Sequence, residues 1–231
     1  MTLTISPGRV GDVLNIRIVL LLFAHIGGQY SAHILGHGSL KGSVPRFNMN
    51  GEGSVPTWYA VILLVMCAAL LAVCAIRAYR AAAPDFRGWT GLALIFAYIS
   101  LDEAIAIHEF FIDPLRDLFG ITRGWLYFAW VIPAAVAVLM MALAYRPFVG
   151  RLPAATRFGF LAAGACYVTG ALGIEAFSGW YLSTRGDDLT YEMIGAGEEL
   201  LELEGTVVFL ATLIAYLGGT ISSLELRFLG E

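Results

Sequence analysis

Six apolar segments, each near the length that crosses a bilayer, constrain this chain more than any other feature. A membrane-spanning helix needs about 20 mostly apolar residues, and the connections between the six segments are short. The chain is 58% hydrophobic and 14% charged, whereas a soluble domain is about one quarter charged. The sequence therefore predicts an all-α integral membrane protein, a bundle of about six transmembrane helices that forms a single transmembrane domain over residues 1–231. The predicted spans are approximately 13–35, 58–79, 88–112, 125–145, 158–182 and 195–221.

The distribution of arginine and lysine predicts the orientation, because cytoplasmic loops are enriched in both. With the N-terminus inside, nine of these residues fall on the inner side and five on the outer side. The inner ones are Arg9, Arg17, Arg77, Arg80, Arg87, Arg146, Arg151, Arg157 and Arg227, and the outer ones are Lys41, Arg46, Arg116, Arg123 and Arg185. We therefore expect both termini in the cytoplasm.

The N-terminus lacks the charged start and the small-residue cleavage site of a signal peptide. The first apolar segment is therefore predicted to be a retained span of a multi-pass protein in the cell inner (plasma) membrane, with the lipid bilayer as its surroundings. No basic patch is present, so nucleic acid is not an expected partner. Cys67, Cys74 and Cys166 lie inside apolar runs and form neither a disulfide framework nor a CxxC zinc motif.

The stretch Ile99–Phe110 ends the third predicted span and carries four ionisable residues. They are Asp102, Glu103, His108 and Glu109. Ionisable groups at membrane depth are expensive and usually mark a functional site. On an unbroken helix, Asp102 and Glu109 would share one face about 10 Å apart, with the other two residues to either side.

Further carboxylates occur in the fifth and sixth predicted spans. Glu175 lies inside the fifth span, and Glu198, Glu199 and Glu202 lie within about 100° of arc at the start of the sixth. Glu204 points elsewhere. The predicted topology places all these carboxylates and all four histidines in one half of the membrane, the outer half. Like charges on one helix face repel, so we expect protons or a bound cation among them.

These residues predict a metal site between helices, because carboxylates and imidazole suit Fe, Mn or Zn. The predicted ligands are Asp102, Glu103, His108, Glu109, Glu175, Glu198, Glu199 and Glu202, with His25, His33 and His37 as further candidates. Helical bundles hold iron or manganese pairs in this way, but their Glu-x-x-His motif is missing here. Ordinary structural roles stay open as well, since acids are favoured at a helix start and buried His or Glu side chains often serve as hydrogen-bonding groups.

Three functions are compatible with this pattern. The first is a metal-dependent membrane oxidoreductase acting on a lipid or another apolar small molecule, with one carboxylate as general base. The second is a cation- or proton-coupled transporter, although the inner halves of the second, third and fifth spans are almost purely apolar. The third is a non-catalytic accessory subunit of a larger membrane complex. A homo-oligomer is compatible with each of them.

Three segments carry a resemblance that covers most of the chain from Trp58 onward. They are SLDEAIAIHE (Ser100–Glu109), GALGIEAFSGWY (Gly170–Tyr181) and EELLELEG (Glu198–Gly205). They resemble motifs of a group of bacterial multi-pass membrane proteins with the patterns SLDEA-x3-HE and EE-x2-E. The resemblance implies that these motifs belong together, and it implies no activity.

Overall fold

The computed structural model describes residues 6–220, and all regular structure within this range is helical. Six helices are long and apolar enough to cross a membrane, which confirms the predicted fold class. They are α1 (Pro7–His33), α3 (Val55–Arg80), α4 (Phe86–Ile105), α6 (Val131–Arg151), the run of α7 (Ala154–Val168), η3 (Thr169–Ile174) and α8 (Glu175–Arg185), and α9 (Leu189–Thr220). The short helices are η1 (Leu40–Gly42), α2 (Ser43–Arg46), η2 (Ile107–Phe111) and α5 (Ile112–Phe119).

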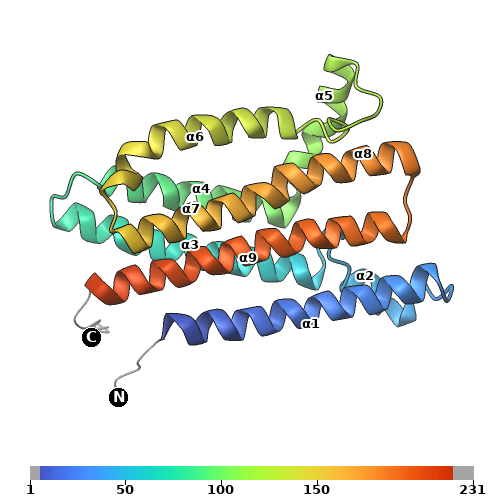
Figure 1. Cartoon of the computed structure of the whole chain (residues 1–231), viewed down its shortest axis with the longest axis horizontal. Helices are drawn as coiled ribbons and strands as arrows, with labels where there is room; N and C mark the ends of the chain where they lie inside the picture. The colour runs from blue at the N-terminus through green and yellow to red at the C-terminus, as the bar shows by residue number, and fades with distance from the viewer. Residues whose placement is uncertain (1–5, 221–231) are drawn as a thin grey trace, which may run out of the picture.

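The long helices lie side by side along one axis, with α1 and α6 at opposite edges (Figure 1). The start of α1 and the end of α9 lie at the same end of the bundle, which we call the terminal end. The opposite end, the far end, carries α5 and the turn between α8 and α9. Which end faces the cytoplasm stays a prediction. Ile221 and Arg227, which the sequence predictions used, lie outside the described residues.

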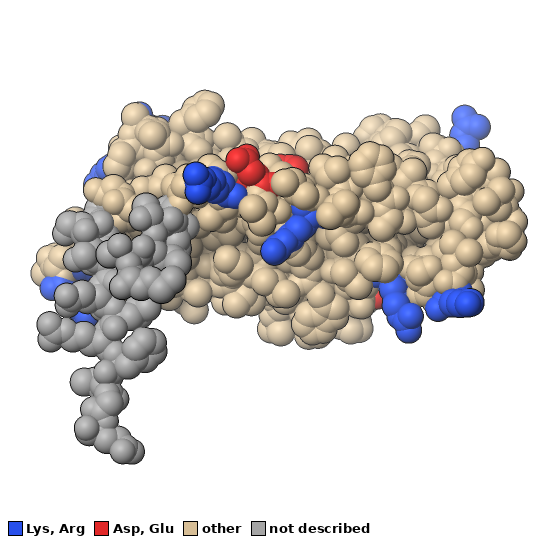
Figure 2. Space-filling view, turned by 90° about the horizontal axis from the view of Figure 1, so that it is seen from below, with Lys and Arg blue, Asp and Glu red and all other residues tan. Residues whose placement is uncertain are grey.

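The outer surface of the bundle is apolar over much of its length. Large apolar side chains in the middle of several spans are exposed, including Leu94, Leu139, Met140, Phe158 and Leu161. Figure 2 shows that one long face carries few charged residues between its two ends. An extensive exposed apolar surface is what a lipid-facing protein presents, so the surface agrees with the helix lengths.

Aromatic rings fill the interior of the terminal half. The ring of Phe209 on α9 stacks on Phe96 of α4 at 4.4 Å and on Phe160 of α7 at 4.3 Å between centroids. Trp89 packs edge-on against Phe148 at 5.0 Å and against Phe160 at 6.2 Å. Offset and edge-on ring pairs are stabilising beyond the area they bury. These rings join α4, α6, α7 and α9 into one core.

The boundaries of the predicted spans shift by several residues in the structure, and the shifts in the third and fourth spans change the placement of motif residues and prolines. The third was expected to continue to residue 112, but α4 ends at Ile105 because Ala106 adopts the left-handed conformation, with φ 51° and ψ 49°. The fourth was expected from residue 125, but α6 begins at Val131. Pro133 therefore lies in the first turn of α6, where proline causes no kink. Pro147 lies inside α6.

Candidate functional site

The end of α4 is shaped by one carboxylate. Asp102 accepts a hydrogen bond from the backbone N–H of His108 at 2.8 Å, and its second oxygen lies 2.9 Å from Nδ1 of the same histidine. These contacts span Ala106, whose left-handed conformation is unfavourable for a residue with a Cβ atom. Burial lowers the pKa of His108, but the hydrogen bond to Asp102 and the Asp102 charge offset this, and the pKa lies above its ordinary value.

The break at Ala106 corrects one prediction from the sequence. Asp102 and Glu109 were expected to share a face of one unbroken helix, but they lie on either side of the left-handed residue. Glu109 is exposed, and it interacts electrostatically with His108 and Glu52. The simple rotation of 100° per residue therefore does not apply across this motif.

A chain of contacts connects this turn to α8 and α9. The His108 ring lies 4.6 Å from the ring of Trp130, and the indole N–H of Trp130 donates to Oε1 of Glu175 at 2.8 Å. Glu175 also interacts electrostatically with Glu198 of α9. The contacts and this interaction thus connect three predicted site residues, one each from η2, α8 and α9.

A second set of acids interacts beside this chain. Glu199 interacts electrostatically with Glu103, Glu202 and Glu52, and Glu202 interacts with Glu103 in turn. The side chain of Tyr167 on α7 also interacts with Glu202. These side chains are partly buried, apart from the more exposed Glu52. The predicted acidic residues of α4 and α9 therefore lie close enough to influence one another electrostatically.

Glu52 was missed in the sequence analysis, because it lies in the Gly- and Ser-rich connection between α1 and α3. Although much of its side chain is exposed, burial of the carboxyl group raises the pKa of Glu52, and the nearby charge of Glu109 raises it further. A polar residue in a loop gives no periodic signal, so the sequence offered no way to assign Glu52 to these acids. Trp130 and Tyr167 were missed because aromatic residues in membrane spans are ordinary.

The π-helix η3 places α8 against α9. A Cβ atom added to Gly170 would lie 2.8 Å from the backbone oxygen of Glu198 and 3.0 Å from Cγ of Glu202. Only glycine allows this approach. Glu175 follows directly after the π-helix, and π-helical turns are frequent at functional sites. The π-helix therefore determines the position of α8 where this helix lies against the acids of α9.

The aromatic core lies one layer below these polar residues. Phe96 precedes Glu103 by seven residues on α4, Phe160 precedes Tyr167 by seven on α7, and Phe209 follows Glu202 by seven on α9. Seven residues of helix rise about 10 Å. The three stacked rings therefore separate the acids from the terminal end, and we call them the aromatic layer.

The histidines of α1 and the following turn lie elsewhere. His25 is buried; its Nδ1 accepts the backbone N–H of Met49 at 3.0 Å, so Nε2 carries the proton and donates to the backbone oxygen of Glu192 at 3.3 Å. Both ring nitrogens are thus engaged in joining α1, the loop and α9. His33 and His37 are exposed, and α1 ends at His33, so the two residues do not share one helix.

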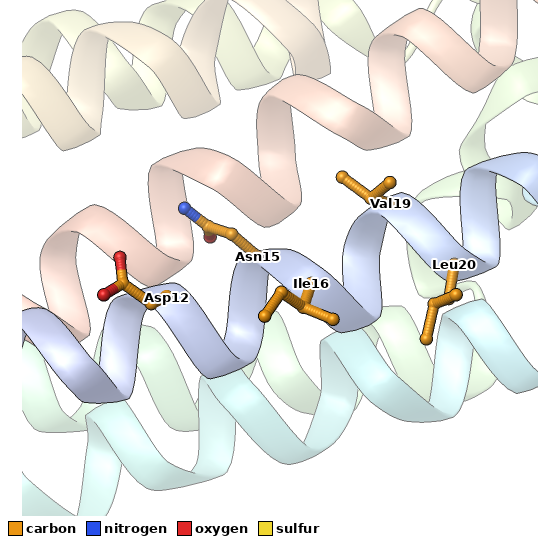
Figure 3. Close-up of a pocket in the computed structure, with 5 residues that line it drawn as sticks. All are labelled: Asp12, Asn15, Ile16, Val19 and Leu20. Carbon is orange, nitrogen blue, oxygen red and sulfur yellow. The ribbon is translucent and has the colours of Figure 1, made fainter.

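The side chains are not arranged around a single point. Within residues 6–220, no group of three or more His, Cys, Asp or Glu residues has a geometry that could hold a metal ion. A shallow groove of about 450 Å³ lies instead on α1, lined by Asp12, Asn15, Ile16, Val19 and Leu20 (Figure 3). This groove lies in the half of α1 nearer the terminal end, away from the predicted site acids of α4, α8 and α9.

The fold defines the class of this chain as a helical, multi-pass membrane protein. The chain matches the model of a family described as a domain of unknown function, DUF8692, over residues 14–217, and it belongs to this family. Comparisons with curated proteins and with solved structures gave no match. The family match bears on neither the bacterial resemblance nor its motifs.

Proposed function

We propose that this protein binds a divalent metal ion, Fe, Mn or Zn, in the far half of the bundle. The proposed ligands come from the acids of α4, α8 and α9, which are Glu103, Glu175, Glu198, Glu199 and Glu202, with Asp102, His108 and Glu109 beside them. The protein would lie in the plasma membrane with both termini in the cytoplasm. Because the side chains do not converge in the structure, binding requires several of them to change rotamer.

One observation carries this proposal: these acids interact with one another, and the basic group that interacts with them is a histidine, His108. Glu199 interacts with Glu103, Glu202 and Glu175. No arginine or lysine within residues 6–220 forms an ion pair with any of these four residues. Carboxylates in a region of low dielectric repel strongly. A divalent cation would replace this repulsion with attraction, and oxygen-rich sets of this type suit Fe, Mn or Zn.

The aromatic layer supports a site that is closed on one side. Phe96, Phe160 and Phe209 stack across the bundle below the acids. A path for ions through the membrane requires polar residues on both sides of the acids, and the stacked rings offer none. A closed site favours an enzyme over a transporter.

A metal ion held here would supply Lewis-acid or redox chemistry. The proposed reaction class is an oxidation or reduction of an apolar small molecule or lipid, since such substrates reach the bundle from the bilayer. A carboxylate that does not bind the metal would accept a proton from the substrate. The protein would act alone, as a homo-oligomer, or within a larger membrane complex.

The metal content of the purified protein tests this proposal. We expect stoichiometric metal by elemental analysis in the wild type after incubation with Fe, Mn or Zn, and its loss in Glu202→Gln and Glu199→Gln. Glu204→Gln is the matched control, because Glu204 lies on the same helix but interacts with Tyr59 and Cys166. A wild-type protein that remains free of metal under these conditions would refute the proposal.

The electrostatic interaction between Glu175 and Glu198 favours a second candidate, a proton-coupled transporter. Chains of Asp, Glu and His side chains within membrane spans occur in proton relays. Proton movement into proteoliposomes, followed with a pH-sensitive dye inside, distinguishes the two. Flux that depends on Glu175 would support the transporter, whereas bound metal without flux would support the enzyme.

A further inference from the structure

The short helix α5 has one apolar side and one polar side. On a helical projection, Phe111, Pro114, Leu115, Leu118 and Phe119 fall on one side, and Asp113, Arg116 and Asp117 fall on the other. The apolar side is open: 72% of Leu118 and 54% of Phe119 is exposed. α5 packs against η2 and lies at the far end, at the edge of the bundle (Figure 1).

The orientation of α5 is fixed by its polar side. The guanidinium of Arg116 lies 4.4 Å from the centroid of the Tyr127 ring and pairs with Asp113 at 2.6 Å. The helix ends at Gly120 in the left-handed conformation, and the N–H of Ile121 returns to the backbone oxygen of Arg116 at 2.9 Å. These contacts hold Arg116 against Tyr127, whereas Asp113 and Asp117 on the polar side and Leu118 and Phe119 on the apolar side are exposed.

The position of α5 in the chain limits its distance from the bilayer. It begins seven residues after the end of α4 and ends before α6 starts at Val131, and both of these helices are membrane spans. Trp125, between α5 and α6, packs against Trp180 and Phe177 of α8, with centroids 6.1 and 5.6 Å apart. Tryptophan is enriched at the level of the lipid headgroups. α5 therefore lies at this level as well.

We propose that α5 is an interfacial helix whose apolar side, with Leu118, Phe119 and Phe111, is embedded in the lipid leaflet at the far end of the bundle. A short amphipathic helix at headgroup depth buries its apolar side in the boundary between headgroups and acyl chains. This inference does not depend on the proposed metal site.

The embedded helix also has a consequence for the turn that holds His108. η2 and α5 are continuous in the chain, with η2 ending at Phe111 and α5 beginning at Ile112. Lipid contact on α5 therefore restrains η2, in addition to the two contacts that Asp102 makes with His108. Removal of the bilayer should loosen this turn before the spans themselves separate.

Spin labels on two adjacent residues of α5 test the proposal in proteoliposomes of the full chain. The variants are Leu118→Cys on the apolar side and Asp117→Cys on the polar side, and the wild-type chain reports the background from its three native cysteines. We expect the label at 118 to relax several-fold more with dissolved oxygen, which concentrates in lipid, than with a water-soluble nickel complex. The label at 117 should show the opposite ratio. Phe119→Cys gives a second position on the apolar side if Leu118→Cys fails to fold.

Two results would overturn the inference. Equal exposure of the labels at 118 and 117 to the nickel complex would place both sides of α5 in water. A label at 118 that is shielded from both reagents, with spin–spin coupling that grows as the ratio of protein to lipid rises, would mean that a second copy covers this side instead. Oxygen contact that is independent of this ratio is the result expected for lipid.

Discussion

Nδ1 of His108 lies 2.9 Å from Oδ2 of Asp102, and Oδ1 of the same carboxylate accepts the backbone N–H of His108 at 2.8 Å. One side chain thus holds the backbone and the ring of a residue six positions later, across the left-handed Ala106. The carboxylate thereby satisfies a backbone group that the end of α4 would leave without a partner.

Replacement of Asp102 should release this turn. In Asp102→Ala we expect faster hydrogen exchange at residues 107–110, because hydrogen bonds to a charged group contribute about 1.5–3 kcal/mol each. Asp113→Ala is the control, since Asp113 is exposed and makes a surface ion pair with Arg116, worth about 0–1 kcal/mol. Equal exchange rates in the two variants would show that Asp102 does not hold the turn.

The left-handed conformation of Ala106 predicts an unusual response to glycine. Ala106→Gly should leave the free energy of unfolding within about 0.5 kcal/mol of wild type or raise it, because glycine adopts positive φ without strain. Ala104→Gly, two residues earlier within α4, should lower it by about 0.5–1 kcal/mol. Urea unfolding in detergent measures both. Equal losses in the two variants would mean that Ala106 is helical in solution.

Trp130→Phe removes the donor that satisfies Glu175. A partly buried carboxyl oxygen without its partner costs about 1–3 kcal/mol, and we expect this loss in the free energy of unfolding, together with weaker metal retention if Glu175 is a ligand. Trp58→Phe is a suitable comparison because Trp58 is exposed, and exposed substitutions usually change stability by less than about 0.5 kcal/mol. Similar values for the two variants would contradict the role assigned to the indole N–H.

The aromatic layer should control access to the acids from the terminal end. Phe209 is 6% exposed and stacks on two rings, so Phe209→Ala should destabilise the fold by about 3–5 kcal/mol. The same variant should speed proton exchange of the acids from the terminal side, measured by infrared spectroscopy of their carboxyl bands. Phe158→Ala, at a 75% exposed site on α7, should change neither property. If proton exchange of the acids is as slow in Phe209→Ala as in wild type, other residues form the barrier.

Acidic pH should weaken the start of α9 through Asp188. Its Oδ1 accepts the backbone N–H groups of Tyr191 and Thr190 at 3.0 and 2.8 Å, and the Tyr191 contact holds the pKa of Asp188 below its ordinary value. Because the folded pKa is depressed, the stabilising contribution of the ionised Asp188 is fully present above the unfolded pKa of about 3.9. This contribution is lost as the pH falls through the folded pKa.

The titration is separated from the capping geometry by Asp188→Asn, which retains a side-chain oxygen but does not ionise. Wild type should exceed this variant in thermal stability at pH 7, and the difference should shrink as the pH falls below about 4. Asp187→Asn provides the comparison, since Asp188, and not Asp187, accepts these hydrogen bonds from the start of α9. A difference that stays constant with pH would exclude the ionised carboxylate as the cause.

Much of the architecture follows from hydropathy. The spans of α1, α3 and α9 were predicted within six residues at each described end, because a lipid-exposed helix must be apolar for about 20 residues. The end of α4 was not predictable in this way. Leu101, Ile105, Ile107 and Phe110 continue the apolar pattern through Ala106, and only the contact of Asp102 with His108 reveals the break.

The candidate site shows the same division. Glu103, Glu175, Glu199 and Glu202 stood out in the sequence because charges in apolar segments are rare. Glu52 did not, because an acid in a polar loop is ordinary. Its interactions with Glu103 and Glu199 arise only when the loop folds over the helices, with Met49 bound to His25.

The sequence by itself therefore determined that the chain is a six-span helical membrane protein with several carboxylates inside its apolar segments. This information is local, since hydropathy and charge act residue by residue along a helix. The tertiary structure alone decided which acids interact, that Trp130, Tyr167 and Glu52 join them, and that three phenylalanines lie beneath. Such contacts depend on helix rotation and on one left-handed residue, which residues distant in the chain set together.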